Sequence, residues 1–398
     1  MTFVVPLFLI APLVVVPLGY RLLDVASPGS GPPGLVLRLV IPAAGILVVS
    51  FWLPQGPVAA TLALPWVAVT GVTAMAAGLR FLGDPERLRP GIRHATDAAV
   101  AFLAVGAVFA FTDRLGARPF GFGSTVILLT AVHFHFAGFA LPIAGAMAWT
   151  RRRTRWLERG IGAVVIGIPV TALGFFGFPI ANWTGALLTA GGGFGIGVAT
   201  VFVARRLATR PARLLGIVAG ASLLVSMPLA IAYATGAFLG VGWLRLDVMA
   251  GVHGTLNALG FALPAMVAWT LDRQAIAVKA APRRAAVSPV KRWSFGLLVG
   301  IVVGFGVLVG GTMVGLLGIV ALLLLAWEPG REAPVGGLMT GFGGTWLVVF
   351  ARADASCGVG CTGPDLTPWY IASAAMLLIG IVLTTRAVSH RRALVGAP

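Results

Sequence analysis

Long apolar runs recur along the whole chain of 398 residues, and no other feature constrains its fold so strongly. Runs of about 18 residues or more have the length that crosses a bilayer as a helix. Lipid tolerates only helices and closed barrels, because no water is present to bond a free backbone group. The strands of a barrel alternate apolar with polar residues, whereas these runs are apolar throughout. We therefore expect an all-α fold, a polytopic membrane helical bundle.

The runs divide into nine predicted spans, a basic stretch and three or four further spans. The first nine lie near residues 2–20, 36–54, 57–79, 96–112, 122–149, 160–180, 183–204, 213–236 and 245–270. The others lie near residues 294–310, 311–327, 335–350 and 369–387. The stretch 294–327 is either one long tilted helix or two short ones that break at Gly310 and Gly311, so we expect 12 or 13 transmembrane helices. Two helices are preferred, because they place Arg386 on the same side as the other basic segments.

Basic residues gather in short clusters between the apolar runs and give the chain a formal net charge of +17. Examples are RRRTRWLER at 151–159 and RRLATRPAR at 205–213. Cytoplasmic loops carry such an excess of Lys and Arg, so the N-terminus is predicted outside and the C-terminus in the cytoplasm. We expect the clusters to contact membrane lipids and no nucleic acid. The first run lacks a basic n-region and a small-residue cleavage site, which indicates a retained helix and not a signal peptide.

The basic stretch 272–293 indicates a domain boundary. We expect a nine-helix membrane core at 1–271, a cytoplasmic linker at 272–293 and a membrane bundle of three or four helices at 294–398. Cys357 and Cys361 lie in a loop predicted on the outer, oxidising side, where a disulfide between them is expected. Two buried or free thiols are the alternative, and a lone CxxxC motif is too weak to indicate a metal site.

Two of the apolar runs resemble each other. HFHFAGFALPIAGAMAWT at 133–150 and HGTLNALGFALPAMVAWT at 253–270 share GFALP and the ending AWT. The GFALP motifs begin at residues 138 and 260, which gives an offset of 260 − 138 = 122. We predict an internal repeat of four helices, in which helices 2–5 recur as helices 6–9. Four spans per copy make the two copies parallel. The alternative is a chance likeness between apolar helices.

Polar side chains interrupt both runs at about the same depth in the membrane. Under the alignment His135 corresponds to Asn257, and His253 lies one turn before Asn257. Imidazole inside a membrane is costly unless it faces protein, water or a ligand, so these residues are candidates for a functional site. The alternative is that they only hold neighbouring helices together. His133 lies two residues from His135, roughly 200° around an α-helix, and should point elsewhere unless the helix bulges.

The leading hypothesis is an enzyme that performs acid–base chemistry on a lipophilic substrate such as an isoprenoid or another lipid. His135 or His253 would be the general acid or base, because imidazole titrates near neutral pH. Asn257 would orient the ring or hold a substrate oxygen, and His133 would complete the catalytic set. The substrate would contact aromatic rings and an acidic group at the outer mouth of the site, namely Phe134, Phe136, Phe139, Phe261 and Asp247. For each ring alone, a lipid-facing position is the alternative, and for Asp247 an interfacial cap.

Two other functions stay open. A transporter of a small or lipophilic solute fits the 54 glycines and the helix-breaking prolines, although almost no buried carboxylate is present for ion coupling. Two histidines on facing helices also suit haem or a metal ion in a redox protein. HxH diverges on a regular helix, however, and no CxxCH motif is present. We therefore expect no cofactor and no metal ligand set, and a hydrophobic small molecule as the partner.

The segments HFHFAGF at 133–139 and HGTLNALGF at 253–261 resemble the YndJ-like family of bacterial multi-spanning proteins. The resemblance covers about residues 35–272. It implies a protein of the bacterial cytoplasmic membrane, and it supports sites at the histidines and the asparagine of these two segments. A transporter label is sometimes attached to the family, but the resemblance names no reaction. It says nothing about residues 294–398.

Overall fold

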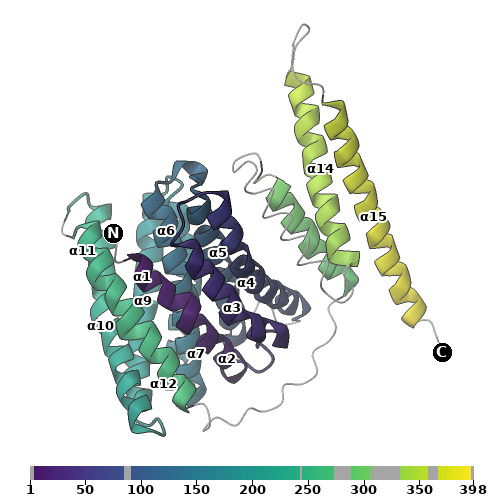
Figure 1. Cartoon of the computed structure of the whole chain (residues 1–398). Coiled ribbons are helices and arrows are strands. Elements are labelled where there is room, and N and C mark those ends of the chain that lie inside the picture. The colour runs from purple at the N-terminus through teal and green to yellow at the C-terminus, as the bar shows by residue number, and fades with distance from the viewer. Residues whose placement is uncertain are drawn as a thin grey trace. The chain divides into compact units, whose positions relative to one another are not determined.

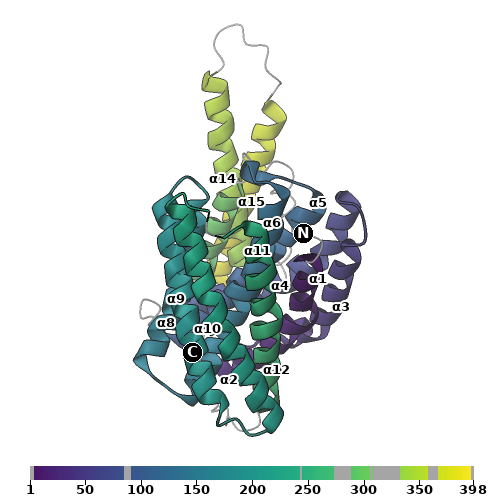
Figure 2. The ribbon, with the colours of Figure 1, turned by 90° about the vertical axis from the view of Figure 1, so that its left-hand side faces the viewer.

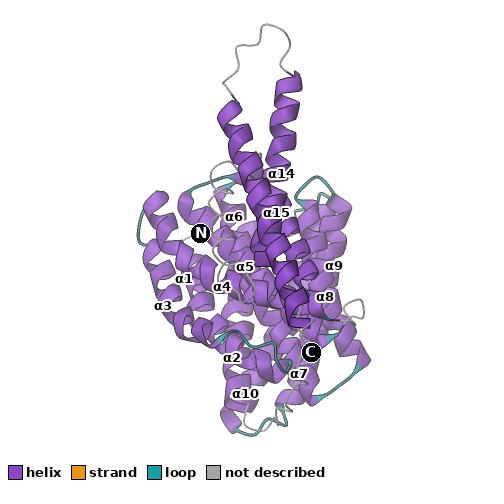
Figure 3. Cartoon of the chain, turned by 90° about the vertical axis from the view of Figure 1, so that its right-hand side faces the viewer, coloured by secondary structure: helices purple, strands orange, loops and turns teal. Residues whose placement is uncertain are grey.

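A computed structural model of the chain describes residues 4–84, 91–242, 244–272, 288–304, 307, 332–356 and 366–395. Within these ranges the backbone forms helices and loops and no strand (Figure 3). Ten of the described helices are long and apolar enough to cross a membrane. The prediction of an all-α polytopic membrane bundle is therefore confirmed.

The chain divides into two compact units. The first unit comprises Met1–Ala77, Glu86–Gly116 and Gly123–Arg283. Its helices, drawn from purple to green in Figure 1, are α1 (Val4–Ile10), η1 (Ala11–Val15), α2 (Val16–Ala26), α3 (Gly34–Ser50), α4 (Pro57–Gly83, which ends in the second unit), α5 (Ile92–Leu115), α6 (Ser124–His133), η3 (Phe134–Ala140), α7 (Leu141–Arg151), α8 (Arg155–Gly174), α9 (Pro179–Ala204), α10 (Arg210–Phe238), α11 (Leu246–Val248), η4 (Met249–His253), η5 (Leu256–Ala262) and α12 (Leu263–Asp272). A short 3₁₀ turn, η2 (Pro119–Gly121), precedes α6.

Most predicted spans coincide with one continuous helical stretch. Eight such stretches lie before the basic linker and two after it. The span predicted at 36–54 corresponds to α3, which has 17 residues and is slightly shorter than a full crossing. The spans predicted at 294–310 and 311–327 lie partly and wholly outside the described residues.

Local sequence signals set several helix ends. Thr209 caps the start of α10, where its side chain accepts a hydrogen bond of 3.2 Å from the Ala212 N–H. Gly116 ends α5 in the left-handed conformation, with φ of 76°, which costs glycine little. Pro169 and Pro228 lie inside α8 and α10. Membrane helices tolerate such prolines because neighbouring groups satisfy the freed backbone carbonyls.

Glycines bring α8, α9 and α10 into close backbone contact. A Cβ added at Gly220 of α10 would lie 2.7 Å from the carbonyl oxygen of Gly197 in α9. A Cβ added at Gly167 of α8 would lie 2.8 Å from the carbonyl oxygen of Gly185 in α9. Small residues allow such packing in membranes, where helices gain no hydrophobic energy by leaving lipid.

Three spans of the first unit contain π-helical segments, which are wider than an α-helix and frequent at functional sites. They are η1 in the first span, η3 in the span that contains HFHF, and η4 with η5 in the last span. η3 contacts both η1 and η5. η3 and η5 start 256 − 134 = 122 residues apart and end 262 − 140 = 122 residues apart, which is the offset of the GFALP motifs. This coincidence supports the internal repeat, which stays a prediction.

The second unit comprises Gly78–Pro85, Ala117–Phe122 and Arg284–Pro398. Its main helices cover residues 289–304, α14 (Glu332–Ser356) and α15 (Thr367–Val395). The helix 289–304 packs closely against α14 at glycine residues, and the two helices run in the same direction. α14 packs against α15, which runs in the opposite direction. Cys357 and Cys361 lie outside the described residues, so their disulfide stays a prediction.

Candidate functional site

His135 lies in the core of the first unit, with none of its surface exposed. Its ring stands edge-on to Phe8 of α1, with ring centroids 5.0 Å apart. The ring of Trp66 in α4 is nearly parallel to it, at a centroid distance of 5.9 Å. Gly106 of α5 closes a further side, because a Cβ there would come within 2.8 Å of Nδ1. Three other helices therefore enclose this imidazole.

Both ring nitrogens of His135 are already bonded. Trp66 donates its indole N–H to Nε2 over 3.1 Å, and Nδ1 lies 2.7 Å from the carbonyl oxygen of Ala131. Indole can only donate and a carbonyl can only accept, so the neutral ring must carry its proton on Nδ1. With both nitrogens occupied, the ring offers neither a lone pair nor a proton to a substrate. His135 joins η3 to α4.

His133 occupies the opposite side of the same helix and is exposed. Its Nδ1 lies 2.8 Å from the carbonyl oxygen of Leu129. The helix widens into η3 directly after His133, yet the two imidazoles still diverge, as α-helical geometry predicts.

His253 and Asn257 belong to a hydrogen-bonded cluster that joins the last span of the first unit, Leu246–Asp272, to α10. Nδ1 of His253 lies 2.9 Å from the carbonyl oxygen of Ser226 in α10, which is fully buried. The Asn257 amide donates to the carbonyl oxygen of His253 over 2.7 Å and accepts the Ser226 hydroxyl proton over 3.4 Å. These bonds hold His253 in place and are typical of polar contacts between membrane helices. Figure 2 shows α10 and α12, the continuation of this span, side by side.

The spans that contain His133 and His253 contact each other through η3 and η5. Each histidine bonds a backbone carbonyl through Nδ1, as His135 does, so in the neutral ring Nε2 carries the lone pair. Within the described part of the chain, neither Nε2 has a hydrogen-bond partner. The structure thus brings the spans of His253 and His133 together, whereas His135 bonds to a different helix from His253.

The predicted substrate-contacting residues have several environments. Phe139 and Phe261 are fully buried, and Phe139 packs edge-on against Tyr20 with centroids 5.7 Å apart. Phe136 is also buried, whereas Phe134 is half-buried and lies against Phe102. Of these rings, Phe139 and Phe261 occupy corresponding positions of the two GFALP motifs.

Asp247 is exposed at the start of the last span. It accepts two hydrogen bonds from Arg245, of 3.0 and 3.1 Å. This ion pair lies well before His253 in the chain, and both its side chains are more than half exposed. Exposed pairs of this kind contribute little to stability.

Sequence reasoning missed an ion pair of this unit whose carboxylate is buried. Arg151, at the end of α7, forms an ion pair with Asp272, at the end of α12. Asp272 also accepts the Ala208 N–H over 2.7 Å. The predicted linker started at residue 272, so Asp272 was counted with solvated loop residues. Arg151 and Asp272 each lie within two residues of the AWT ending of a related run, and this was the available signal.

The two segments that contain the histidines lie in a region that matches a known protein family. The family model for YndJ-like proteins matches residues 6–261, about 64% of the chain. The chain belongs to the YndJ-like family. The match contains every histidine and asparagine of the site, and it begins about 30 residues before the predicted resemblance. Membership and the apolar helices together make this YndJ-like protein a multi-pass membrane protein.

One curated relative is the "Uncharacterized membrane protein YndJ" of Bacillus subtilis (strain 168), which is 29% identical over 178 residues. The aligned region covers 43% of this chain and 31% of the relative, so the chain matches about a third of the length of that protein. No solved structure matches this YndJ-like chain.

Proposed function

We propose that this YndJ-like protein is a membrane enzyme that performs acid–base chemistry on a lipophilic substrate, with His133 and His253 as the reacting pair. The observation that carries the proposal is the pair of Nε2 atoms without a hydrogen-bond partner among the described residues, on two spans that contact each other. His135 then serves as a structural anchor, and Asn257 positions His253.

The backbone bonds set the chemical role of the pair. A neutral ring that donates Nδ1–H to a carbonyl can only accept at Nε2. A substrate hydroxyl or amine would donate there, and Nε2 would take its proton when the substrate reacts. The resulting imidazolium keeps its bond to the carbonyl, so the ring does not have to turn. A general base of this kind contributes typically 10²–10⁴-fold to a rate.

The surroundings of the pair favour a substrate that enters from lipid. Val252 and Leu259 flank His253 in the same span and are 48% and 42% exposed. Counted along the helices from Ser124 and Leu246, the two histidines lie roughly 10–14 Å inside the membrane. Under the predicted orientation, with the N-terminus outside and the C-terminus in the cytoplasm of a bacterium, this is the outer leaflet. An isoprenoid or another lipophilic substrate could reach this depth from the surrounding lipid.

A transporter is the second candidate, and the Arg151–Asp272 ion pair favours it. The pair joins two spans at one end, whereas the imidazole pair lies in the other half of the same spans. A solute site closed on one side and accessible on the other is the arrangement that alternating access requires. The small and lipophilic solutes considered above would bind at the same imidazole pair.

Lipid analysis separates these functions. Total lipid extracts from cells with and without the gene are compared by mass spectrometry, and the enzyme predicts a difference that His253→Asn reproduces. Asn can still donate to the Ser226 carbonyl while it removes Nε2. Thr255→Ala, at an exposed position of the same span, is the matched control and should behave as the unmodified protein.

The other outcomes of these measurements would support a different function or overturn both proposals. Unchanged lipids together with altered solute uptake into vesicles would support the transporter and contradict the enzyme. An absorbance band of haem, or a stoichiometric metal in the purified protein, would support a redox function instead. Unchanged lipids and unchanged uptake would overturn both proposals.

A further inference from the structure

We propose that the second unit binds one acyl chain of an anionic phospholipid in a cavity between three of its described helices, with the lipid phosphate held by the basic residues at the rim. This inference is independent of the function proposed for the first unit, because the two sites share no residue.

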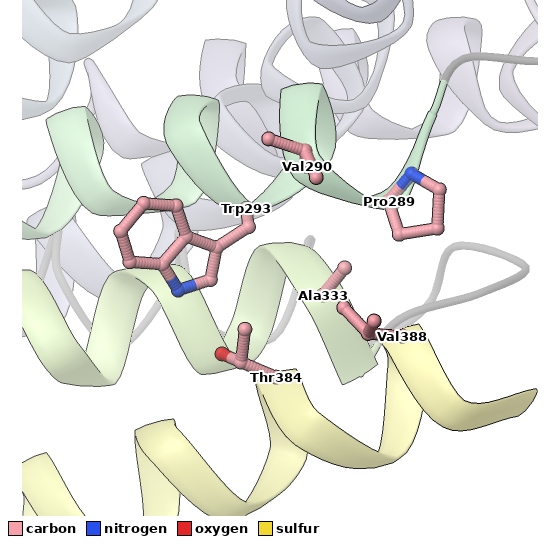
Figure 4. Close-up of a pocket in the computed structure, with 6 residues that line it drawn as sticks. All are labelled: Pro289, Val290, Trp293, Ala333, Thr384 and Val388. Atoms are coloured by element: carbon pink, nitrogen blue, oxygen red, sulfur yellow. The ribbon is translucent and has the colours of Figure 1, made fainter.

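The cavity has a volume of about 170 Å³. Residues from all three helices line it, and Figure 4 draws them as sticks: Pro289, Val290, Trp293, Ala333, Thr384 and Val388. An apolar cavity of about 150 Å³ stays dry and takes up apolar molecules of the size of benzene. The volume is therefore sufficient for part of a hydrocarbon chain.

The described lining residues offer a polar ligand little beyond the indole N–H of Trp293. Among them Thr384 supplies a hydroxyl group, which already donates to the carbonyl oxygen of Gly380 over 2.7 Å. The other lining atoms are apolar, apart from the indole N–H of Trp293. Burial of a polar group against such a surface would cost free energy without a compensating hydrogen bond. An apolar chain fits this lining.

The cavity is open on one side. Val290, at the start of the helix 289–304, is 62% exposed, and Trp293 is half-buried. Tryptophan prefers the boundary between the hydrocarbon and the headgroups of a bilayer. A lipid could thus insert one chain while its headgroup stays at that boundary.

Basic residues lie within two positions of the lining residues. Lys291 and Arg292 are in the helix 289–304, and Arg386 lies between Thr384 and Val388 in α15. The described residues of these two helices contain no Asp or Glu, and among the described residues of α14 the acidic Glu332 stands at the start. Long basic side chains extend along apolar surface to reach the headgroups, so an excess of positive charge at this rim selects an anionic phosphate lipid.

The test measures thermal unfolding of the full chain in detergent with added phosphatidylglycerol or phosphatidylcholine of identical acyl chains. We expect phosphatidylglycerol to raise the unfolding temperature clearly more than phosphatidylcholine does. Soluble glycerol 3-phosphate should have no effect, because it has no acyl chain. Equal shifts with both lipids, or the same shift with glycerol 3-phosphate, would overturn the proposal.

Two classes of variant separate the chain from the headgroup. Val388→Phe and Thr384→Leu fill the cavity, and Lys291→Gln with Arg292→Gln removes charge from the rim. Each should abolish most of the phosphatidylglycerol effect, whereas Arg159→Gln, at an exposed basic position of the first unit, should retain it. Retention of the full effect in the filled variants would contradict the cavity.

A second readout does not depend on the variants. A photoactivatable phosphatidylglycerol with its reactive group in the acyl chain is cross-linked to the unmodified protein, and the labelled peptides are mapped. We expect labelling at residues 289–293 and 384–388, several-fold above the label on exposed lipid-facing helices such as α8. Uniform labelling of all spans would overturn the proposal, because it would indicate bulk lipid only.

Discussion

Arg151 and Asp272 form an ion pair that joins the ends of two spans 121 residues apart in the sequence. The carboxylate is almost fully buried, and its second oxygen accepts the Ala208 N–H. Both residues end a helix, so the two spans run in the same direction, as the predicted parallel repeat requires. The contact fixes one end of the pair of spans that contain His133 and His253.

Asp272→Asn should lower the free energy of unfolding by about 1–3 kcal/mol. The amide keeps a hydrogen-bond acceptor for Ala208 but leaves the half-buried guanidinium of Arg151 without its counter-charge. Chemical unfolding in detergent measures the effect. Arg152→Gln, at the exposed neighbouring position, is the control and should change stability little. Equal stability of the two variants would show that the ion pair does not hold the spans.

Trp66→Phe should destabilise the protein by about 1–3 kcal/mol, because it leaves the buried Nε2 of His135 without a donor. Trp156→Phe is the matched control, since Trp156 is 43% exposed. Adding His135→Leu to Trp66→Phe should recover part of the loss, because the unpaired acceptor is then absent. Strict additivity of the two substitutions in this cycle would contradict the hydrogen bond.

Gly106→Ala should cost about 1–3 kcal/mol through overpacking. Its Cβ would come within 2.8 Å of the His135 ring and 2.9 Å of Phe134 Cβ. Gly162→Ala in α8 meets no atom within 4 Å and should instead stabilise the helix slightly. Thermal unfolding of the two variants side by side checks the enclosure of His135; a neutral Gly106→Ala would exclude it.

His253→Asn should retain the fold and lose at least about 10²-fold of the activity, since it removes the proposed base and keeps the contact with α10. His133→Asn should do the same, because both rings belong to one pair. The measurement is turnover of the lipid that the comparison of extracts identifies. Full activity in either variant would restrict the site to the other histidine.

Much of the fold follows from the sequence because hydrophobic length alone identifies a membrane span. The angular spacing of residues on an α-helix predicted that His133 and His135 diverge. The partners of His135 could not be predicted, because Trp66 lies in an apolar run that looks like any other, 69 residues away. The π-helices have no composition of their own. Asp272 was assigned to a loop because a single acidic residue before a basic stretch does not reveal a buried ion pair.

Cysteine cross-linking tests the central claim most directly. His133→Cys and His253→Cys are introduced together in a background with Cys357→Ser and Cys361→Ser, and a short bifunctional maleimide is added to membranes. The account predicts rapid intramolecular cross-linking of this pair and slow cross-linking when Thr255→Cys replaces His253→Cys. The absence of a cross-link between positions 133 and 253, with both thiols reactive towards a monofunctional maleimide, would contradict the imidazole pair.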